Sequence, residues 1–274
     1  MKWFQRIFNF YLNASIHVAL SVFSLVQLTA IQFDVPINSH LSYGLFFATI
    51  SSYNFVKYGV EAPKYVKMAN TYQKQIQVLG VLALLGALYH FYFLGLDIWI
   101  GLISLCLLSG LYALPLLPNA KNLRSLGGFK IFVVATVWTG TTVALPLQEA
   151  QLPMSWDYGI GLGQRFLLIL ILLLPFEIRD LKYDPLELQT LPQRYGIKKT
   201  KQIGILLSIL LFFSTFLKDT VHSMEVYLNA LLTLTLCILI WISKKDQNVY
   251  FASFWVESVP ILWWGIYLLA VSYY

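Results

Sequence analysis

The residues best suited to chemistry in this chain are three acids at the end of a long apolar run. Glu177, Asp180 and Asp184 are spaced i, i+3 and i+7, so a helix would carry all three on one face. The helix would begin inside an apolar segment near Phe166, and the acids would emerge where hydrocarbon meets water. Carboxylates are costly there without a partner, and a cation is the usual one. The spacing favours a site for magnesium and a diphosphate over a solvated helix end whose acids pair with nearby basic residues.

Composition places the chain in a membrane. Of its 274 residues 58% are hydrophobic and only 12% are charged, which is outside the range of soluble domains. Apolar stretches of about 18–24 residues, each long enough to cross a bilayer, recur along the sequence. We therefore predict an all-α integral membrane protein, one domain over residues 1–274, with nine transmembrane helices in a single bundle around a central cavity. The predicted spans are about 10–31, 41–58, 76–94, 96–117, 129–148, 159–178, 202–217, 224–243 and 251–272.

The basic residues predict an orientation. With nine spans, all but two of the 19 lysines and arginines fall at the N-terminus or on the even-numbered connections, the exceptions being Arg165 and Lys218. Positively charged connections stay in the cytoplasm. The N-terminus is therefore predicted to be cytoplasmic, in a multi-pass protein of the cell inner (plasma) membrane. The net charge of +6 follows from this topology and needs no nucleic acid as a partner.

A recognisable segment follows the acids. Residues 189–196 include Thr190-Leu191-Pro192 and Gly196. Together with the acids, they resemble the second aspartate-rich motif of the UbiA superfamily of intramembrane prenyltransferases. In that family a D-x-x-D-x-x-x-D helix end runs into a loop reading roughly G-x-x-T-L-P-x-x-x-G. Asp180 and Asp184 match, and Glu177 replaces the leading aspartate. Nine spans with polar connections after spans two, four and six also look like that family.

The resemblance implies a reaction. A Mg²⁺-dependent prenyltransferase would move an isoprenoid chain from a polyprenyl diphosphate to an aromatic or other lipophilic acceptor within the membrane. Metal-assisted cleavage of the carbon–oxygen bond would give an allylic cation that the acceptor captures. Asp180 and Asp184 would be catalytic, and Glu177, Asp180, Asp184 and Glu61 would be the metal ligands. The acceptor, the prenyl chain length and the oligomeric state stay open, and membrane lipid is an expected partner.

The family's first aspartate-rich motif is altered in this chain. The family shows N-D-x-x-D-x-x-x-D at the end of its second span, where this chain keeps Asn54 but places Glu61 one residue out of register. Either the site holds a single metal and Lys57 supplies the charge of the second ion, or this half-site is inactive and Lys57 pairs with Glu61 or Asp180. The aspartate positions hold other residues: Phe55, Tyr58 and Ala62.

The fourth connection is similar to the family's tyrosine and basic cluster. Tyr112 closes a span, and Lys121 and Arg124 follow it. Basic side chains facing a metal across a diphosphate would hold the leaving group. A cytoplasmic connection that is basic only because of topology explains the two charges almost as well. The predicted diphosphate ligands are Asn54, Lys57, Tyr112, Lys121, Arg124 and Arg179.

Two other functions stay open. A family member that has lost its first half-site would bind a lipid or a partner without catalysis. A small secondary transporter would use the acids as a proton or sodium site at a broken helix. Acids near the cytoplasmic boundary, rather than the midplane, count against transport. The altered first motif counts in favour of the non-catalytic protein.

Overall fold

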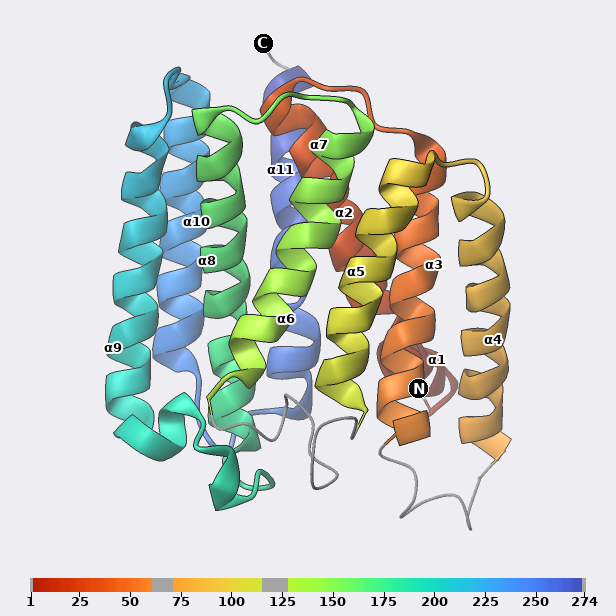
Figure 1. Cartoon of the computed structure of the whole chain (residues 1–274). Helices are drawn as coiled ribbons and strands as arrows, with labels where there is room; N and C mark the ends of the chain where they lie inside the picture. The colour runs from red at the N-terminus through yellow and green to blue at the C-terminus, as the bar shows by residue number, and fades with distance from the viewer. Residues whose placement is uncertain (1, 61–70, 115–127, 273–274) are drawn as a thin grey trace.

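The computed structural model describes residues 2–60, 71–114 and 128–272, which form one bundle of helices without strands (Figure 1). This confirms the predicted all-α membrane fold. The long helices run up and down side by side and are joined by connections at the two ends. Their bounds are α1 Lys2–Asn13, α2 Ile16–Phe33, α3 Ser39–Phe55, α4 Thr71–Phe91, α5 Leu96–Ala113, α6 Lys130–Thr139, α7 Leu145–Glu149, α8 Trp156–Asp180, α9 Leu191–Ser214, α10 Ser223–Ile242 and α11 Val259–Ser272.

Eight helical segments in the described part are long and apolar enough to cross a membrane. Large apolar side chains on their outer faces, such as Leu82, Leu107 and Leu234, are exposed, as expected of surfaces that face lipid rather than water. The nine-span count requires α3, with 17 residues, as the ninth crossing. It lies between α2 and α4, and the N- and C-terminal helices end at opposite ends of the bundle (Figure 1).

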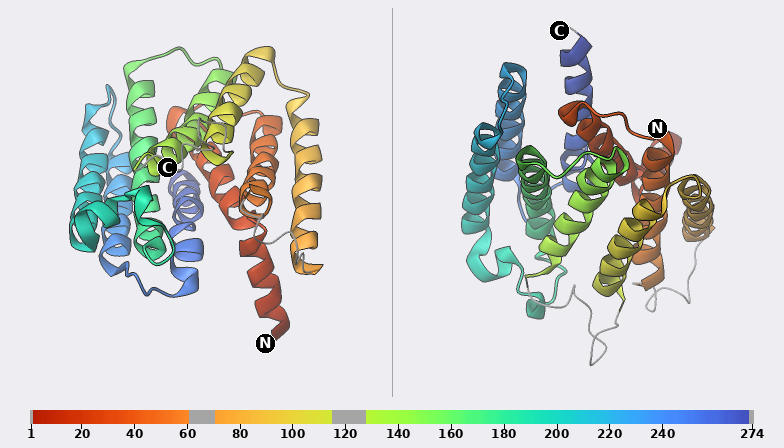
Figure 2. Two further views of the ribbon diagram at one scale, coloured as in Figure 1. Left: turned by 60° about the horizontal axis from the view of Figure 1, so that its bottom comes forward. Right: turned by 45° about the horizontal axis from the view of Figure 1, so that its top comes forward.

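The first span begins later than the predicted range of 10–31. The chain breaks at Ser15, which has a left-handed backbone (φ 60°, ψ 20°), and α2 starts at Ile16. Asn54 of α3 forms hydrogen bonds with the two residues at this break. Its amide donates a hydrogen bond to the Ala14 carbonyl (3.1 Å) and accepts one from Ser15 Oγ (2.8 Å). The segment before the break, α1, therefore leaves the bundle and projects from it (Figure 2).

The seventh span is longer than the predicted 202–217, because α9 already begins at Leu191. Gln193 accepts a hydrogen bond at Oε1 from the Thr190 backbone N–H (2.9 Å), which is one half of a capping box. Pro192 lies in the first turn, where its missing N–H has no cost. Gly196 then interrupts the helix with φ 76° and ψ 163°, a conformation that favours glycine. The Thr-Leu-Pro and glycine residues of the motif thus shape the chain after the acids.

The two basic residues outside the topological pattern both have partners inside the protein. Arg165 of α8 is buried and donates hydrogen bonds to the Leu25 carbonyl (2.9 Å) and to Thr29 Oγ1 (3.3 Å) on α2. Lys218 pairs with Glu225. Charged groups within a bundle need such partners because lipid offers none. These contacts fasten α8 to α2 and the end of α9 to α10.

Close helix packing makes one glycine of α3 sensitive to substitution. A methyl group at Gly44 would lie 2.4 Å from Cε1 of the buried Phe91 ring on α4. We expect Gly44→Ala to lower the free energy of unfolding by about 1–3 kcal/mol, the usual cost of overpacking. Thermal unfolding of the purified protein in detergent would measure it. Gly110→Ala on α5 is the control, because no atom lies within 4 Å of a methyl group there. Equal unfolding midpoints for the two variants would contradict the packing.

Candidate functional site

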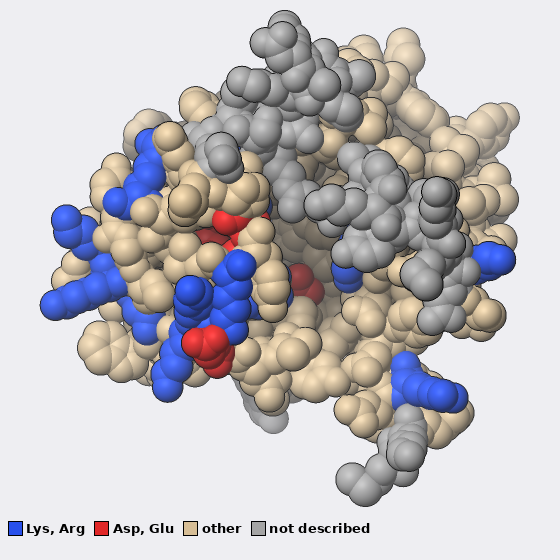
Figure 3. All heavy atoms as spheres, turned by 90° about the horizontal axis from the view of Figure 1, so that it is seen from below, with Lys and Arg blue, Asp and Glu red and all other residues tan. Residues whose placement is uncertain are grey.

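A cavity of about 220 Å³ lies among α2, α3, α5, α6, α8 and the start of α11. Its walls are mostly apolar, and its ionisable side chains are Lys130, Glu177, Asp180 and Glu257, besides two tyrosines. Seen from the lower end of Figure 1, lysine and arginine side chains gather beside a hollow in which acidic side chains are visible (Figure 3). The cavity therefore combines an apolar interior with a charged end.

The end of α8 brings the three predicted acids together. Glu177 and Asp180 lie in its last turns and border the cavity. The chain turns once more after the helix, because the N–H groups of Tyr183 and Asp184 both donate to the Asp180 carbonyl (2.8 Å each). Gln193 Nε2 then donates to the carbonyls of Asp184 and of the next residue, both at 3.1 Å. Asp184 is thereby held one turn beyond Asp180.

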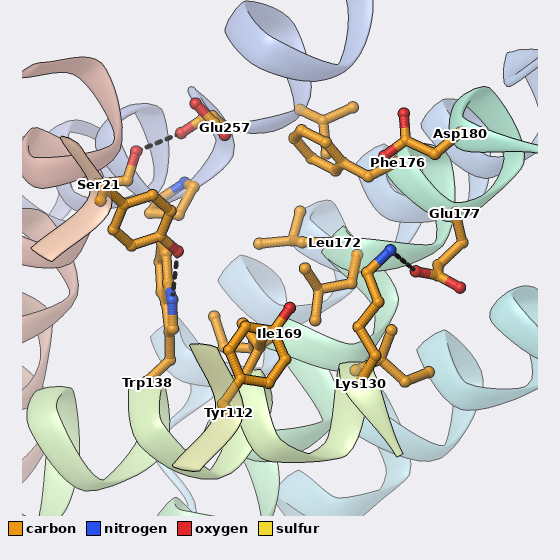
Figure 4. A pocket seen from close by; sticks show the side chains of 16 residues that line it. Ser21, Tyr112, Lys130, Trp138, Ile169, Leu172, Phe176, Glu177, Asp180 and Glu257 are labelled. Atoms are coloured by element: carbon orange, nitrogen blue, oxygen red, sulfur yellow. Dashed lines mark hydrogen bonds and ion pairs between the residues drawn. The ribbon is translucent and has the colours of Figure 1, made fainter. Parts of the chain in front are cut away.

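Lys130, which the sequence analysis used only for topology, lies between two of these acids. Its ammonium is 2.9 Å from Glu177 Oε1 and 3.1 Å from Asp184 Oδ2. The lysine is the first residue of α6 and borders the cavity (Figure 4). One signal in the sequence was available: Lys130 is the second residue of the predicted span 129–148, so its charge had to lie at the membrane boundary, as the acids do.

Asp180, the acid that Lys130 does not contact, also has a basic neighbour. Arg179 donates two hydrogen bonds to Asp180, from Nε to Oδ1 (2.7 Å) and from a terminal nitrogen to Oδ2 (3.2 Å). Its guanidinium also lies over the Phe176 ring, 5.0 Å from the centroid. Arg179 is thus close to the acids, and its role as a diphosphate ligand stays a prediction.

A second ion pair ties the acidic segment to the connection before α11. Lys182 pairs with Asp246. The hydrogen bond from Lys182 lowers the pKa of Asp246, and the same bond raises the pKa of Lys182. Both side chains are solvated, so the pair orients the loop more than it stabilises the fold.

The described residues of the predicted first half-site, Asn54 and Lys57, contact the chain around the break before α2. Asn54 is buried and bonded to the break before α2, as described above. Lys57 donates a hydrogen bond to the Asn13 carbonyl (3.4 Å) and borders a different depression beside α1. Among the described residues predicted as diphosphate ligands, Tyr112 borders the cavity (Figure 4). Glu61, Lys121 and Arg124 lie outside the described residues.

The described donors fit one magnesium ion rather than a closed cage. No group of three or more metal-ligating side chains is arranged around a point in residues 2–60, 71–114 and 128–272. Mg²⁺ is, however, commonly bound through one or two carboxylates together with substrate phosphates and water. Asp180 and Glu177 border the cavity and supply such carboxylates. An ion at this end would therefore be completed by a diphosphate.

Glu257 faces the acids from the opposite wall. It follows a π-helical turn (Phe251–Val256), and its backbone carbonyl accepts a hydrogen bond from Ser21 Oγ (2.5 Å). Figure 4 shows Glu257 and Ser21 across the cavity from Glu177 and Asp180. No hydrogen bond or ion pair within the described residues reaches its carboxylate. A carboxyl group in such surroundings is costly, which makes Glu257 a candidate for contact with a ligand.

Comparison with known proteins identifies the fold. No protein-family model and no curated protein sequence matches the chain. Solved structures do. A UbiA homologue from Archaeoglobus fulgidus bound to GPP and Mg²⁺ matches with a TM-score of 0.64 and 13% identity, over 96% of this chain and 99% of that chain. The same homologue bound to DMAPP and Mg²⁺ matches with a TM-score of 0.61 and 11% identity, at the same coverage. The chain has the UbiA fold.

A second solved structure supports the same fold. The structure of a digeranylgeranylglyceryl phosphate synthase matches with a TM-score of 0.57 and 15% identity, over 97% of each chain. The likeness runs the length of the bundle at very low identity, so it defines the fold and the multi-pass membrane architecture. Within the UbiA fold, the individual site residues rest on the geometry of this chain.

The unpaired position of Glu257 predicts a gain in stability when its charge is removed. We expect Glu257→Leu to raise the unfolding midpoint by roughly 2–4 °C, which corresponds to about 1 kcal/mol for a chain of this size. Differential scanning fluorimetry in detergent would measure the shift. The matched control is Glu225→Leu, which should lower the midpoint because it strips Lys218 of its partner. A lower midpoint for Glu257→Leu would reveal a stabilising partner instead.

Proposed function

We propose that the protein transfers an isoprenoid chain from a polyprenyl diphosphate to an aromatic or other lipophilic acceptor within the membrane. The observation that carries the proposal is the cavity. It has carboxylates and an ammonium at one end and an apolar interior, which suits a molecule with a charged head and a hydrocarbon tail. Solved structures of the same fold that bind GPP or DMAPP with Mg²⁺ support the same substrate class.

The charged end would hold the diphosphate. Asp180 would hold Mg²⁺ together with diphosphate oxygens, beside Glu177 and Asp184, which are paired with Lys130. The ion would neutralise charge on the leaving group. Lys130 and Arg179 lie close enough to add positive charge at the same end. The Tyr112 hydroxyl, on the facing wall, would donate a hydrogen bond to the diphosphate. Lys121 and Arg124 are proposed as further ligands from the sequence.

The apolar interior would protect the reacting carbon. Cleavage of the carbon–oxygen bond leaves the electron pair on the diphosphate and an allylic cation in the cavity. Phe176 and Trp138 offer aromatic faces that stabilise a cation, while Ile169 and Leu172 exclude water that would otherwise capture it. The acceptor would then form the new bond and lose a proton.

Release of diphosphate tests the proposal. We expect purified protein in lipid to release diphosphate from prenyl diphosphates of several chain lengths in the presence of Mg²⁺, and to stop in EDTA. Asp180→Asn should lower the rate at least 100-fold, because it removes the cavity-facing carboxylate proposed to hold the ion. The control is Asp34→Asn at the far end of the bundle, where the left-handed backbone (φ 50°) accepts asparagine.

The outcomes separate the candidate functions. Binding of a prenyl diphosphate without release, with or without phenolic and lipid acceptors, would favour a non-catalytic lipid-binding protein. Neither binding nor release would overturn the proposal. Proton- or sodium-coupled flux through vesicles that depends on Asp180 would favour transport.

We further propose that the acidic end of the bundle faces the cytoplasm of a cell whose inner (plasma) membrane holds the protein. Single cysteines would test this, with Cys106 and Cys237 replaced by alanine. Asp246→Cys lies at the acidic end and Asp219→Cys at the opposite end, beside Asp157. A membrane-impermeant thiol reagent should label the cysteine at position 219 in intact cells, and that at position 246 only after permeabilisation. The reverse pattern would refute the orientation.

A further inference from the structure

The carboxylates of Glu177 and Asp184 are bridged by an internal cation. Lys130 Nζ lies 2.9 Å from one and 3.1 Å from the other. Glu177 lies in the last turns of α8 and Asp184 lies four residues beyond its end, and Lys130 reaches both from the first residue of α6. The side chains are largely shielded from solvent, with relative exposures of 4% for Glu177, 12% for Asp184 and 16% for Lys130. A divalent ion bridging the same oxygens would have to take the place of the ammonium.

Displacing the ammonium would be costly. Breaking a buried ion pair by removing one partner is strongly destabilising, because the other charge is left unpaired. A Mg²⁺ ion replacing Lys130 would also have to shed part of its water shell, which it does reluctantly. Lys130 would then remain beside the cavity as an unpaired cation. The Glu177–Asp184 pair is therefore already neutralised in part without metal.

Asp180 differs from this pair. Its partner, Arg179, is the adjacent residue on the same helix end and is partly exposed, at 30% against 24% for Asp180. An exposed pair of this kind contributes little to stability. Arg179 can therefore turn to a phosphate while Asp180 turns to an ion.

The Lys130 ammonium has three N–H donors. Two of them point to Glu177 and Asp184, which leaves a third for a diphosphate oxygen.

We propose that Lys130 permanently takes the place of one divalent ion on Glu177 and Asp184, so that the protein binds a single ion, through Asp180 and the diphosphate of its substrate. This inference rests on the proposed function for the identity of the substrate. Its central claim, that the acid pair becomes a metal site only when Lys130 is removed, does not require the substrate to be present.

Metal binding without substrate tests the claim. Mn²⁺ is the probe, because it shares the oxygen ligands of Mg²⁺ and gives an electron paramagnetic resonance signal. In the absence of diphosphate, the wild-type protein should bind no Mn²⁺ tightly, and Mg²⁺ should leave its unfolding midpoint unchanged. Lys130→Met should have a lower midpoint in EDTA, bind one Mn²⁺, and regain its midpoint when Mg²⁺ is added. The double variant Lys130→Met/Glu177→Gln should lose this metal rescue.

Two results obtained without diphosphate would overturn the proposal. One is tight Mn²⁺ binding and Mg²⁺ stabilisation of the wild-type protein without diphosphate, which would make the acids a metal site beside which Lys130 is incidental. The other is a folded Lys130→Met variant that neither binds Mn²⁺ nor responds to Mg²⁺, which would make Lys130 a purely structural partner.

The wild-type ion count keeps the proposal testable if no Lys130 variant folds. With inorganic diphosphate bound, the wild-type protein should hold one Mn²⁺, and two would overturn the proposal. Absence of diphosphate release from prenyl diphosphates would count against the proposed function alone, since the metal response of the substrate-free variants is independent of it.

Discussion

The ion triad of Lys130, Glu177 and Asp184 is the interaction on which the polar end of the cavity depends. It joins the start of α6 to the end of α8, and it lets a nearly buried glutamate persist at the boundary of an apolar bundle. Buried carboxylates need partners because the surroundings do not solvate them. Without the lysine, Glu177 and Asp184 would lose the ion-pair partner that they share.

The same requirement explains the other polar contacts inside the bundle. Arg165 donates hydrogen bonds to a carbonyl and a hydroxyl of α2, and Lys218 forms an ion pair with Glu225. Asn54 donates a hydrogen bond to the backbone at the break before α2. Each group is matched within the protein because lipid supplies neither donors nor acceptors. Glu257 stands apart: no described residue pairs with its carboxylate, which faces the cavity where the proposed substrate would lie.

The motif residues divide into two kinds. Glu177, Asp180 and Asp184 present charge to the cavity or its edge, whereas Thr190, Pro192 and Gly196 start and bend α9. The first turn of α9 also positions an acid, because Gln193 in that turn donates hydrogen bonds to the backbone carbonyls of Asp184 and the next residue. The internal lysine is a physical reason why this acidic cluster can remain stable without a bound metal.

Although Asp184 lies beyond the end of α8, the sequence alone determined the membrane class, most of the spans and the shared helix face of Glu177 and Asp180. These follow from hydropathy and from the helical period, which are local properties of the chain. It did not predict the break at Ser15 or the early start of α9. It also did not predict that Asn54 bonds to the break before α2, or that Lys130 pairs with the acids. Those depend on which residues of distant helices meet. Lys130 faces Glu177 and Asp184 only because α6 packs against α8, and a single sequence does not encode that choice of neighbours in any local pattern.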